Sequence, residues 1–217
     1  MAGQYGWAAG LSNQYTHRVH RTLLYLIAGW SGYFVMGVEL LGGRLLAPYF
    51  GSSIYVWGAI ITVFMLALSI GYLAGGRASL HAPSLRRLAL ILLAAALTTA
   101  PILLYGDALL DRLSVAVRDP RFGSLSAAML LFFVPTVISG MVSPYAVRLL
   151  VADLRGAGDR VGRLYFVSTF GSAAGTLLTS FYLVLYLEIN QIIELMLAVS
   201  ALVSALAFLP IAETVAA

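Results

Sequence analysis

One carboxylate, Glu39, lies within a long apolar stretch and is the first residue whose type could do chemistry. An ionisable group inside a membrane span is costly and usually faces protein or water. In one interpretation Glu39 is a proton-relay carboxylate or the counter-ion of a cationic ligand. In the other it forms a structural ion pair with Arg44 or Arg121 near the membrane interface. The structural pair is the simpler interpretation, and the residues alone leave both open.

The other polar groups are typical of solvated structure. Asn190 and Glu194 are four residues apart, with Glu188 and Gln191 beside them, as at a helix start that contacts water. The glycine-rich segment 156–162 follows no strand and lacks the dinucleotide-binding spacing. These groups therefore predict no binding site.

No combination of residues predicts catalysis or a cofactor. His17 and His20 form only an i, i+3 pair in an N-terminal arm, and His81 lies in a polar loop. The chain has no Cys, which excludes disulfides and Cys-ligated metals, and no Ser-His-Asp set is evident. We expect no catalytic residues, no metal and no cofactor.

The composition indicates the element type that must carry Glu39. Of the 217 residues, 61% are hydrophobic and 10% are charged, whereas soluble domains have about 25% charged residues. All thirteen basic residues are Arg, and with nine acidic residues they give a net charge of +4. Because Arg is common at the ends of membrane helices, this charge does not predict nucleic-acid binding. The expected class is an all-α integral membrane protein.

Six stretches are long enough to span a bilayer, which requires about 20 mostly apolar residues. The predicted domain covers 22–209, with spans at about 22–47, 55–75, 88–105, 126–150, 161–186 and 189–209. Residues 1–21 are expected to form a cytoplasmic arm, and 210–217 a cytoplasmic tail. Segment 106–125 carries Leu110, Leu113 and Val117 on one helical face, which predicts a separate amphipathic helix at the interface.

The distribution of Arg predicts the orientation. With the N-terminus inside, nine Arg residues lie on the inner side and four on the outer side. The positive-inside rule then places both termini in the cytoplasm of a bacterial-type inner membrane. The main role expected for the cytoplasmic basic loops is to set topology and bind lipid headgroups. Their residues are Arg77, Arg86, Arg87, Arg148, Arg155, Arg160 and Arg163.

Rows of small residues predict which helices approach closely, because small side chains allow helix backbones to pack in lipid. The rows are Gly32 and Gly43, which share a stripe with Met36 and Glu39; Ala67, Gly71 and Gly75; and Gly171 and Gly175, with Ser168 and Ser172 beside them. We expect the first, second and fifth spans to meet at one tight centre. The third span has no such row and is expected at the lipid-facing periphery.

A weak internal repeat is also present. Pro48-Tyr49 ends the first span, Pro144-Tyr145 lies near the end of the fourth, and a small-residue helix follows each. Three spans per half would give the halves opposite topology, as in inverted-repeat transporters. The pattern is thus compatible with a 3+3 inverted repeat.

Long strings of the sequence resemble the membrane domain of spermidine synthase-like proteins. They are Glu39–Gly58, Ser69–Arg77, Ser139–Arg148 and Gly162–Thr176. In that family a hydrophobic region, described as similar to half of a major facilitator transporter, precedes a cytoplasmic aminopropyltransferase-like domain. The sequence contains no counterpart of that domain, so we expect this chain not to synthesise spermidine by itself.

Two functions are compatible with these features. The first is a non-catalytic membrane subunit that packs on other membrane proteins, or whose basic loops recruit a separate cytoplasmic synthase. The second is a transport or binding module for a cationic small molecule such as a polyamine. It would act as an oligomer and use a polar site formed by Glu39, Arg44, Ser168 and Ser172. Membrane lipid is an expected partner in both cases.

Overall fold

The computed structural model describes residues 4–151 and 156–209, with side chains from His20 onward. Every element in this part of the chain is helical. The elements are α1 (Gln4–Phe50), α2 (Ile54–Ala78), α3 (Leu85–Thr99), α4 (Pro101–Ala116), α5 (Pro120–Gly140), α6 (Val142–Leu150), α7 (Ala157–Leu178), the π-helix η1 (Thr179–Leu183), α8 (Val184–Tyr186) and α9 (Ile189–Leu206). The predicted tail 210–217 and Arg155 lie outside the described residues.

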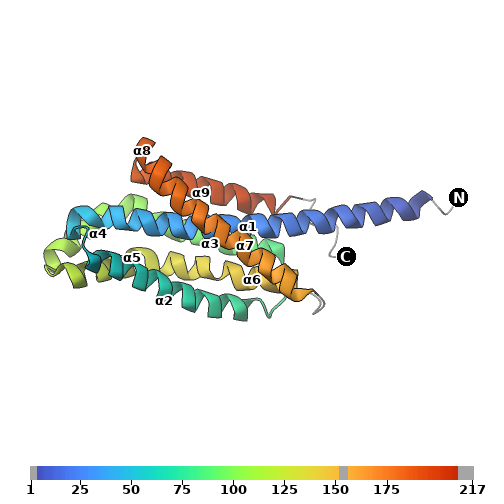
Figure 1. Cartoon of the computed structure of the whole chain (residues 1–217), viewed down its shortest axis with the longest axis horizontal. Coiled ribbons are helices and arrows are strands. Elements are labelled where there is room, and N and C mark those ends of the chain that lie inside the picture. Colours follow the sequence, from blue (N-terminus) through green and yellow to red (C-terminus); the bar gives the residue numbers. More distant parts are fainter. Residues whose placement is uncertain (1–3, 152–155, 210–217) are drawn as a thin grey trace.

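The described helices form six segments long and apolar enough to cross a membrane, which confirms the all-α membrane class. These segments are His20–Phe50, Ile54–Ala78, Leu85–Ala116, Pro120–Leu150, Ala157–Tyr186 and Ile189–Leu206. Their connections gather at two ends of an elongated bundle (Figure 1). We call them the Tyr49 end, which holds the α1–α2, α4–α5 and α8–α9 connections, and the Arg87 end, which holds the α2–α3 and α6–α7 connections.

Helix α1 extends past the rest of the bundle on its N-terminal side (Figure 1). Residues 4–21, expected as an arm, form the first turns of this helix. At the other end of α1, Gly51 has a φ of +81°, and its N–H donates to the carbonyl of Ala47 at 2.9 Å. A left-handed glycine is a common way to end a helix. It turns the chain into α2.

The third span is longer than expected, and the predicted interfacial helix over 106–125 is wrong. Residues up to Ala116 belong to α4, and α5 begins at Pro120. Leu110 is fully buried in the core. The apolar face that predicted an interfacial helix therefore packs against the bundle. An amphipathic pattern does not distinguish a lipid surface from a protein surface.

Prolines divide two of the spans. Pro101 is the first residue of α4, and Pro144 follows the interruption at Met141 between α5 and α6. Proline has no N–H and its ring clashes with the preceding turn, so a continuous helix is disfavoured there. At Met141 the backbone tightens, and its N–H donates to the carbonyl of Ile138 at 3.1 Å.

The small-residue rows form two separate tight pairs, not the single centre expected from the sequence. One pair is α1 with α7. The other is α2 with α5 and the start of α6. On α7, a Cβ at Gly171 would overlap the carbonyl oxygen of Gly29, and one at Gly175 would overlap that of Tyr33. Because residue numbers rise together along α1 and α7, this pair is parallel.

The α2–α5 pair is also held by close backbone contact at glycines. A Cβ at Gly71 would overlap the carbonyl oxygen of Val137, and one at Gly75 the backbone of Met141. Ala67, one turn before Gly71, is fully buried. Backbone carbonyls cannot move aside as a flexible side chain can, so each of these close approaches requires glycine.

The positions of α3 and α7 are the reverse of those expected: α3 is packed into the bundle, and α7 lies at its periphery. Helix α3 packs against α5 and α9 and buries seven of its residues. Helix α7 buries only Leu164 and Gly175. In α7 the small residues form a narrow strip along α1, and the remaining circumference carries exposed aromatic and aliphatic side chains. Helix α3 packs with Leu and Ala, so the absence of glycine did not indicate its environment.

The helix pairs are those that an inverted repeat requires. Exchanging the first span with the fourth, and the second with the fifth, converts the α1–α7 pair into the α5–α2 pair. The third and sixth spans then pair with each other, and α3 does contact α9.

Candidate functional sites on two faces of helix α1

Glu39 lies on α1 between its contacts with two other helices. A Cβ at Gly32 would overlap the Ser168 carbonyl oxygen of α7, and one at Gly43 would meet the Trp57 ring of α2. Glu39 falls between these two glycines on the same stripe. Both glycines are buried, whereas Met36 and Glu39 are only half-buried. The carboxylate therefore emerges between α7 and α2, which have no strong contact with each other.

Glu39 is deep within its span. It is eleven residues before Phe50, which corresponds to about 16 Å along the helix axis. Within the described residues, its carboxylate has no hydrogen bond or ion pair. It is thus an intramembrane acid whose partner is not supplied by the described part of the chain.

The expected pair of Glu39 with Arg44 is not formed. Five helical residues turn the chain by about 500°, so the two side chains point about 140° apart. The Arg44 guanidinium instead donates to the carbonyl oxygen of Val184 at 3.5 Å. Carbonyls at a helix C-terminus lack partners within the helix, and Arg is a common group to bind them.

The alternative pair with Arg121 is also absent. The Arg121 guanidinium carbon lies 4.7 Å from the centre of the Tyr55 ring, a cation–π geometry at the start of α2. The structural ion pair proposed from the sequence is therefore wrong for both partners.

Ser168 and Ser172 belong to α7 and pack against the Glu39 stripe of α1 at the level of Gly32. The Ser172 hydroxyl donates to the carbonyl of Ser168 at 3.1 Å, within α7. Both residues border Gly32, seven residues from Glu39, or about 10 Å along the axis. The four residues predicted as one polar site are therefore divided: Glu39 and the two serines lie along one face of α1, and Arg44 lies on another.

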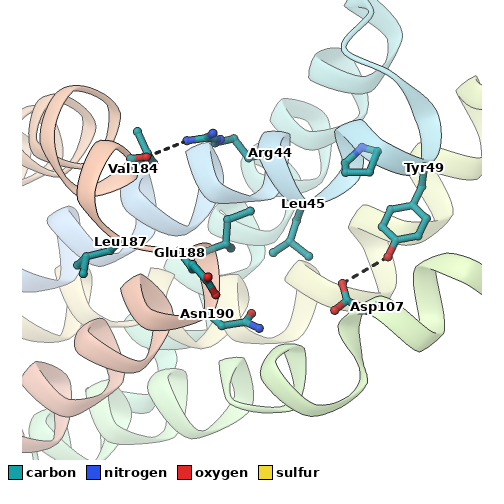
Figure 2. A pocket seen from close by; sticks show the side chains of 10 residues that line it. Arg44, Leu45, Tyr49, Asp107, Val184, Leu187, Glu188 and Asn190 are labelled. Atoms are coloured by element: carbon teal, nitrogen blue, oxygen red, sulfur yellow. Dashed lines mark hydrogen bonds between the residues drawn. The ribbon is translucent and has the colours of Figure 1, made fainter.

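That other face borders a pocket of about 400 Å³ at the Tyr49 end. Its walls come from the end of α1, from α4 and from the α8–α9 connection (Figure 2). They are formed by Arg44, Leu45, Pro48, Tyr49, Asp107, Val184, Leu187, Glu188, Ile189 and Asn190. Pro48 is nine residues from Glu39, about 180° around α1, so the pocket and Glu39 lie on opposite sides of this helix.

The charged groups of the pocket are held by local contacts. The Tyr49 hydroxyl donates to Asp107 at 3.4 Å. Glu188 caps α9: its side chain accepts from the N3 backbone, and the Gln191 side chain accepts from the Glu188 N–H at 3.0 Å. The predicted solvated helix start is thus a capping box. Neither carboxylate forms an ion pair with Arg44.

Sequence reasoning did not find this pocket. Asp107 belonged to the expected interfacial helix, and Glu188 to an ordinary helix start. The available signal was the pair of acidic residues at the predicted outer ends of two spans. Nothing in the sequence showed that the α1–α9 packing would bring them to one face.

Several basic residues at the Arg87 end form local contacts. Arg87 donates to the carbonyls of His81 and Ala82, and Arg160 donates to that of Leu150 at 3.4 Å. Arg163 pairs with Asp159 at 3.1 Å. The remaining described members are Arg77, Arg86 and Arg148, and all three are exposed.

Comparison of the sequence with protein-family models and curated proteins, and of the fold with solved structures, found no match.

Proposed function

We propose that this protein is a non-catalytic integral membrane subunit that packs on another membrane protein through the Glu39 face of α1 and the flanking side of α7. The observation that carries the proposal is Glu39. This carboxylate is half-buried, deep within a span, and without a partner in the described chain.

The energetics favour a protein partner over lipid. A carboxylate near the centre of a membrane helix costs about 2.5–3.5 kcal/mol when it faces lipid. A hydrogen-bond donor or a cation on a partner helix would remove much of this cost. Such a partner would also give the acid a structural role that the chain itself does not supply.

The surface of α7 provides the rest of the proposed interface. In the span Ala157–Tyr186, which contains α7, only 11% of the most apolar 18-residue stretch is buried, compared with 33–50% for the other five spans. Beside Ser168 and Ser172, the same side of α7 exposes Thr169 and Ala173. Small side chains such as these let another helix approach closely.

The resemblance to the membrane domain of spermidine synthase-like proteins supports a subunit role, because in that family the membrane region accompanies a catalytic domain. The proposed location is a bacterial-type inner membrane with both termini cytoplasmic. The Arg87 end would then face the cytoplasm. Its exposed Arg77 and Arg148 would be available to lipid headgroups or to a separately encoded synthase domain.

Site-specific photo-crosslinking in native membranes tests the proposal. A crosslinking amino acid at Thr169, which is exposed beside Ser172, should yield one product of discrete mass that contains a different membrane protein. The same probe at Leu97, exposed on α3, is the matched control and should yield none. Equal products from both positions would contradict the proposed interface.

A charge variant adds a second readout. Glu39→Leu should leave the isolated protein folded and weaken co-purification with the crosslinked partner. If Glu39→Leu instead abolishes folding of the isolated chain, the carboxylate has an internal structural role and the proposal loses its basis.

The alternative is a transport or binding module for a cationic small molecule such as a polyamine. The pairing of α1–α7 with α2–α5 favours it, because inverted repeats are frequent in transporters. A second copy would then cover the Glu39 face, and Glu39 would be the counter-ion. A crosslink from Thr169 to another copy of this chain, with amine uptake lost in Glu39→Gln, would favour this alternative over the subunit.

A further inference from the structure

The pocket at the Tyr49 end carries a cation and two carboxylates that are not paired with each other. Figure 2 shows Arg44 beside Val184 on one side, Asp107 beside Tyr49 on the other, and Glu188 between them. The space between is bordered by apolar side chains such as Leu45, Leu187 and Ile189. A volume of about 400 Å³ lies within the usual range for small-molecule pockets.

Each charged group keeps unused bonding capacity. The Arg44 guanidinium has five N–H donors, and one contact, at 3.5 Å to the Val184 carbonyl, is recorded. Asp107 accepts from Tyr49 through Oδ1 at 3.4 Å, which leaves its second oxygen. The Glu188 carboxylate accepts one capping bond and can accept others. The pocket therefore offers an anion-binding group and cation-binding groups at separate positions.

We propose that this pocket binds a zwitterion in which a short linker joins a phosphate to a primary ammonium, as in phosphoethanolamine. The phosphate would bind the Arg44 guanidinium, whose planar fork matches phosphate oxygens. The ammonium would donate to Asp107 and Glu188. A purely cationic ligand would be repelled by Arg44, and a purely anionic one by the two carboxylates.

A membrane location gives this chemistry two sources. One is the headgroup of phosphatidylethanolamine, since the pocket lies where the spans end. The other is the free zwitterion in solution. Trimethylammonium has no N–H donor, and a glycerol headgroup has no positive charge. Phosphatidylcholine and phosphatidylglycerol therefore separate the ammonium requirement from general lipid binding.

Native mass spectrometry of the purified full-length protein tests the inference. Titration with each of the three lipids should show a preference for phosphatidylethanolamine. Arg44→Gln and Asp107→Asn should each reduce its binding by about threefold, as expected for exposed charged contacts. Arg112→Gln and Glu194→Gln are matched controls, because these residues are exposed on α4 and α9 and do not border the pocket. They should have no effect.

Soluble phosphoethanolamine distinguishes the sources. If it competes with the lipid, the zwitterionic group is sufficient; if only the lipid binds, the acyl chains contribute. Both results support the pocket when the Arg44 and Asp107 variants weaken binding. Equal binding of all three lipids, or equal losses in the control variants, would overturn the inference. Because Asp107→Asn tests the ammonium end alone, the inference stays testable if Arg44→Gln is unstable. The pocket lies opposite Glu39, so its failure would leave the proposed interface unaffected.

Discussion

The close approach of α2 to the α5–α6 junction gives a quantitative prediction at adjacent glycines. A Cβ at Gly75 would lie 2.6 Å from the Met141 Cα, whereas one at Gly76 would have no neighbour within 4 Å. Ordinary Cβ contacts begin at 3.4 Å, so Gly75→Ala requires the helices to separate by about 1 Å. A gap of this size forfeits a quarter to a half of the dispersion energy of each affected contact.

We expect Gly75→Ala to destabilise the protein by about 1–3 kcal/mol, the usual cost of overpacking. Gly76→Ala should be neutral or stabilising, because alanine favours helix by about 1 kcal/mol over glycine. For a chain of this size, about 1 kcal/mol shifts Tm by about 2–4 °C. Thermal unfolding in detergent, followed by tryptophan fluorescence, should therefore separate the two variants by about 5 °C. Equal Tm values would refute the close contact.

A double variant extends the same experiment to the arrangement of the pairs. Gly171→Ala should also destabilise the protein, because its Cβ would overlap the carbonyl of Gly29. If α1–α7 and α2–α5 are separate pairs, the effects of Gly75→Ala and Gly171→Ala should add to within about 0.5 kcal/mol. Strong non-additivity would favour the single packing centre that the sequence suggested.

Three further predictions concern buried polar groups. The Trp30 indole N–H donates to Ser200 at 2.8 Å, so Ser200→Ala should lower stability by about 1 kcal/mol, measured by thermal unfolding, and no change would exclude a net contribution. The Tyr145 hydroxyl accepts from the Ser84 N–H at 3.2 Å; Tyr145→Phe should therefore increase hydrogen exchange at the α2–α3 loop, and unchanged exchange would argue against this contact. The Thr179 hydroxyl is buried without a hydrogen-bond partner, so Thr179→Val should raise stability by about 1 kcal/mol, whereas a lower Tm would show that the hydroxyl is satisfied.

Much of the secondary structure could be predicted because it depends on local properties. Long apolar runs locate membrane helices, since every backbone polar group in lipid must be satisfied within its own segment. The predicted starts of the second and sixth spans agree with Ile54 and Ile189 to within one residue. The third span was the exception, because its second half is amphipathic and its packing surface was mistaken for a lipid-facing one.

The candidate sites could be predicted only in part. The sequence identified Glu39, the residue with the highest cost in lipid, but its expected partners were wrong. The predicted pair of Glu39 with Arg44 was wrong because it ignored helical phase. The two residues are close in sequence but lie on different sides of α1. The pocket joins Asp107 to Glu188 across residues distant in the chain, so no local pattern could reveal it.

By itself, the sequence determined the membrane class, the six helices and the presence of an intramembrane carboxylate, because hydropathy and helix formation are properties of short segments. The small-residue rows also showed which helix faces could approach another backbone. Only the tertiary structure decided that α7 pairs with α1 and α2 with α5, and that Glu39 and Arg44 serve opposite faces. The physical reason is that a row of glycines allows another helix backbone to approach closely, but it does not determine which helix that partner is.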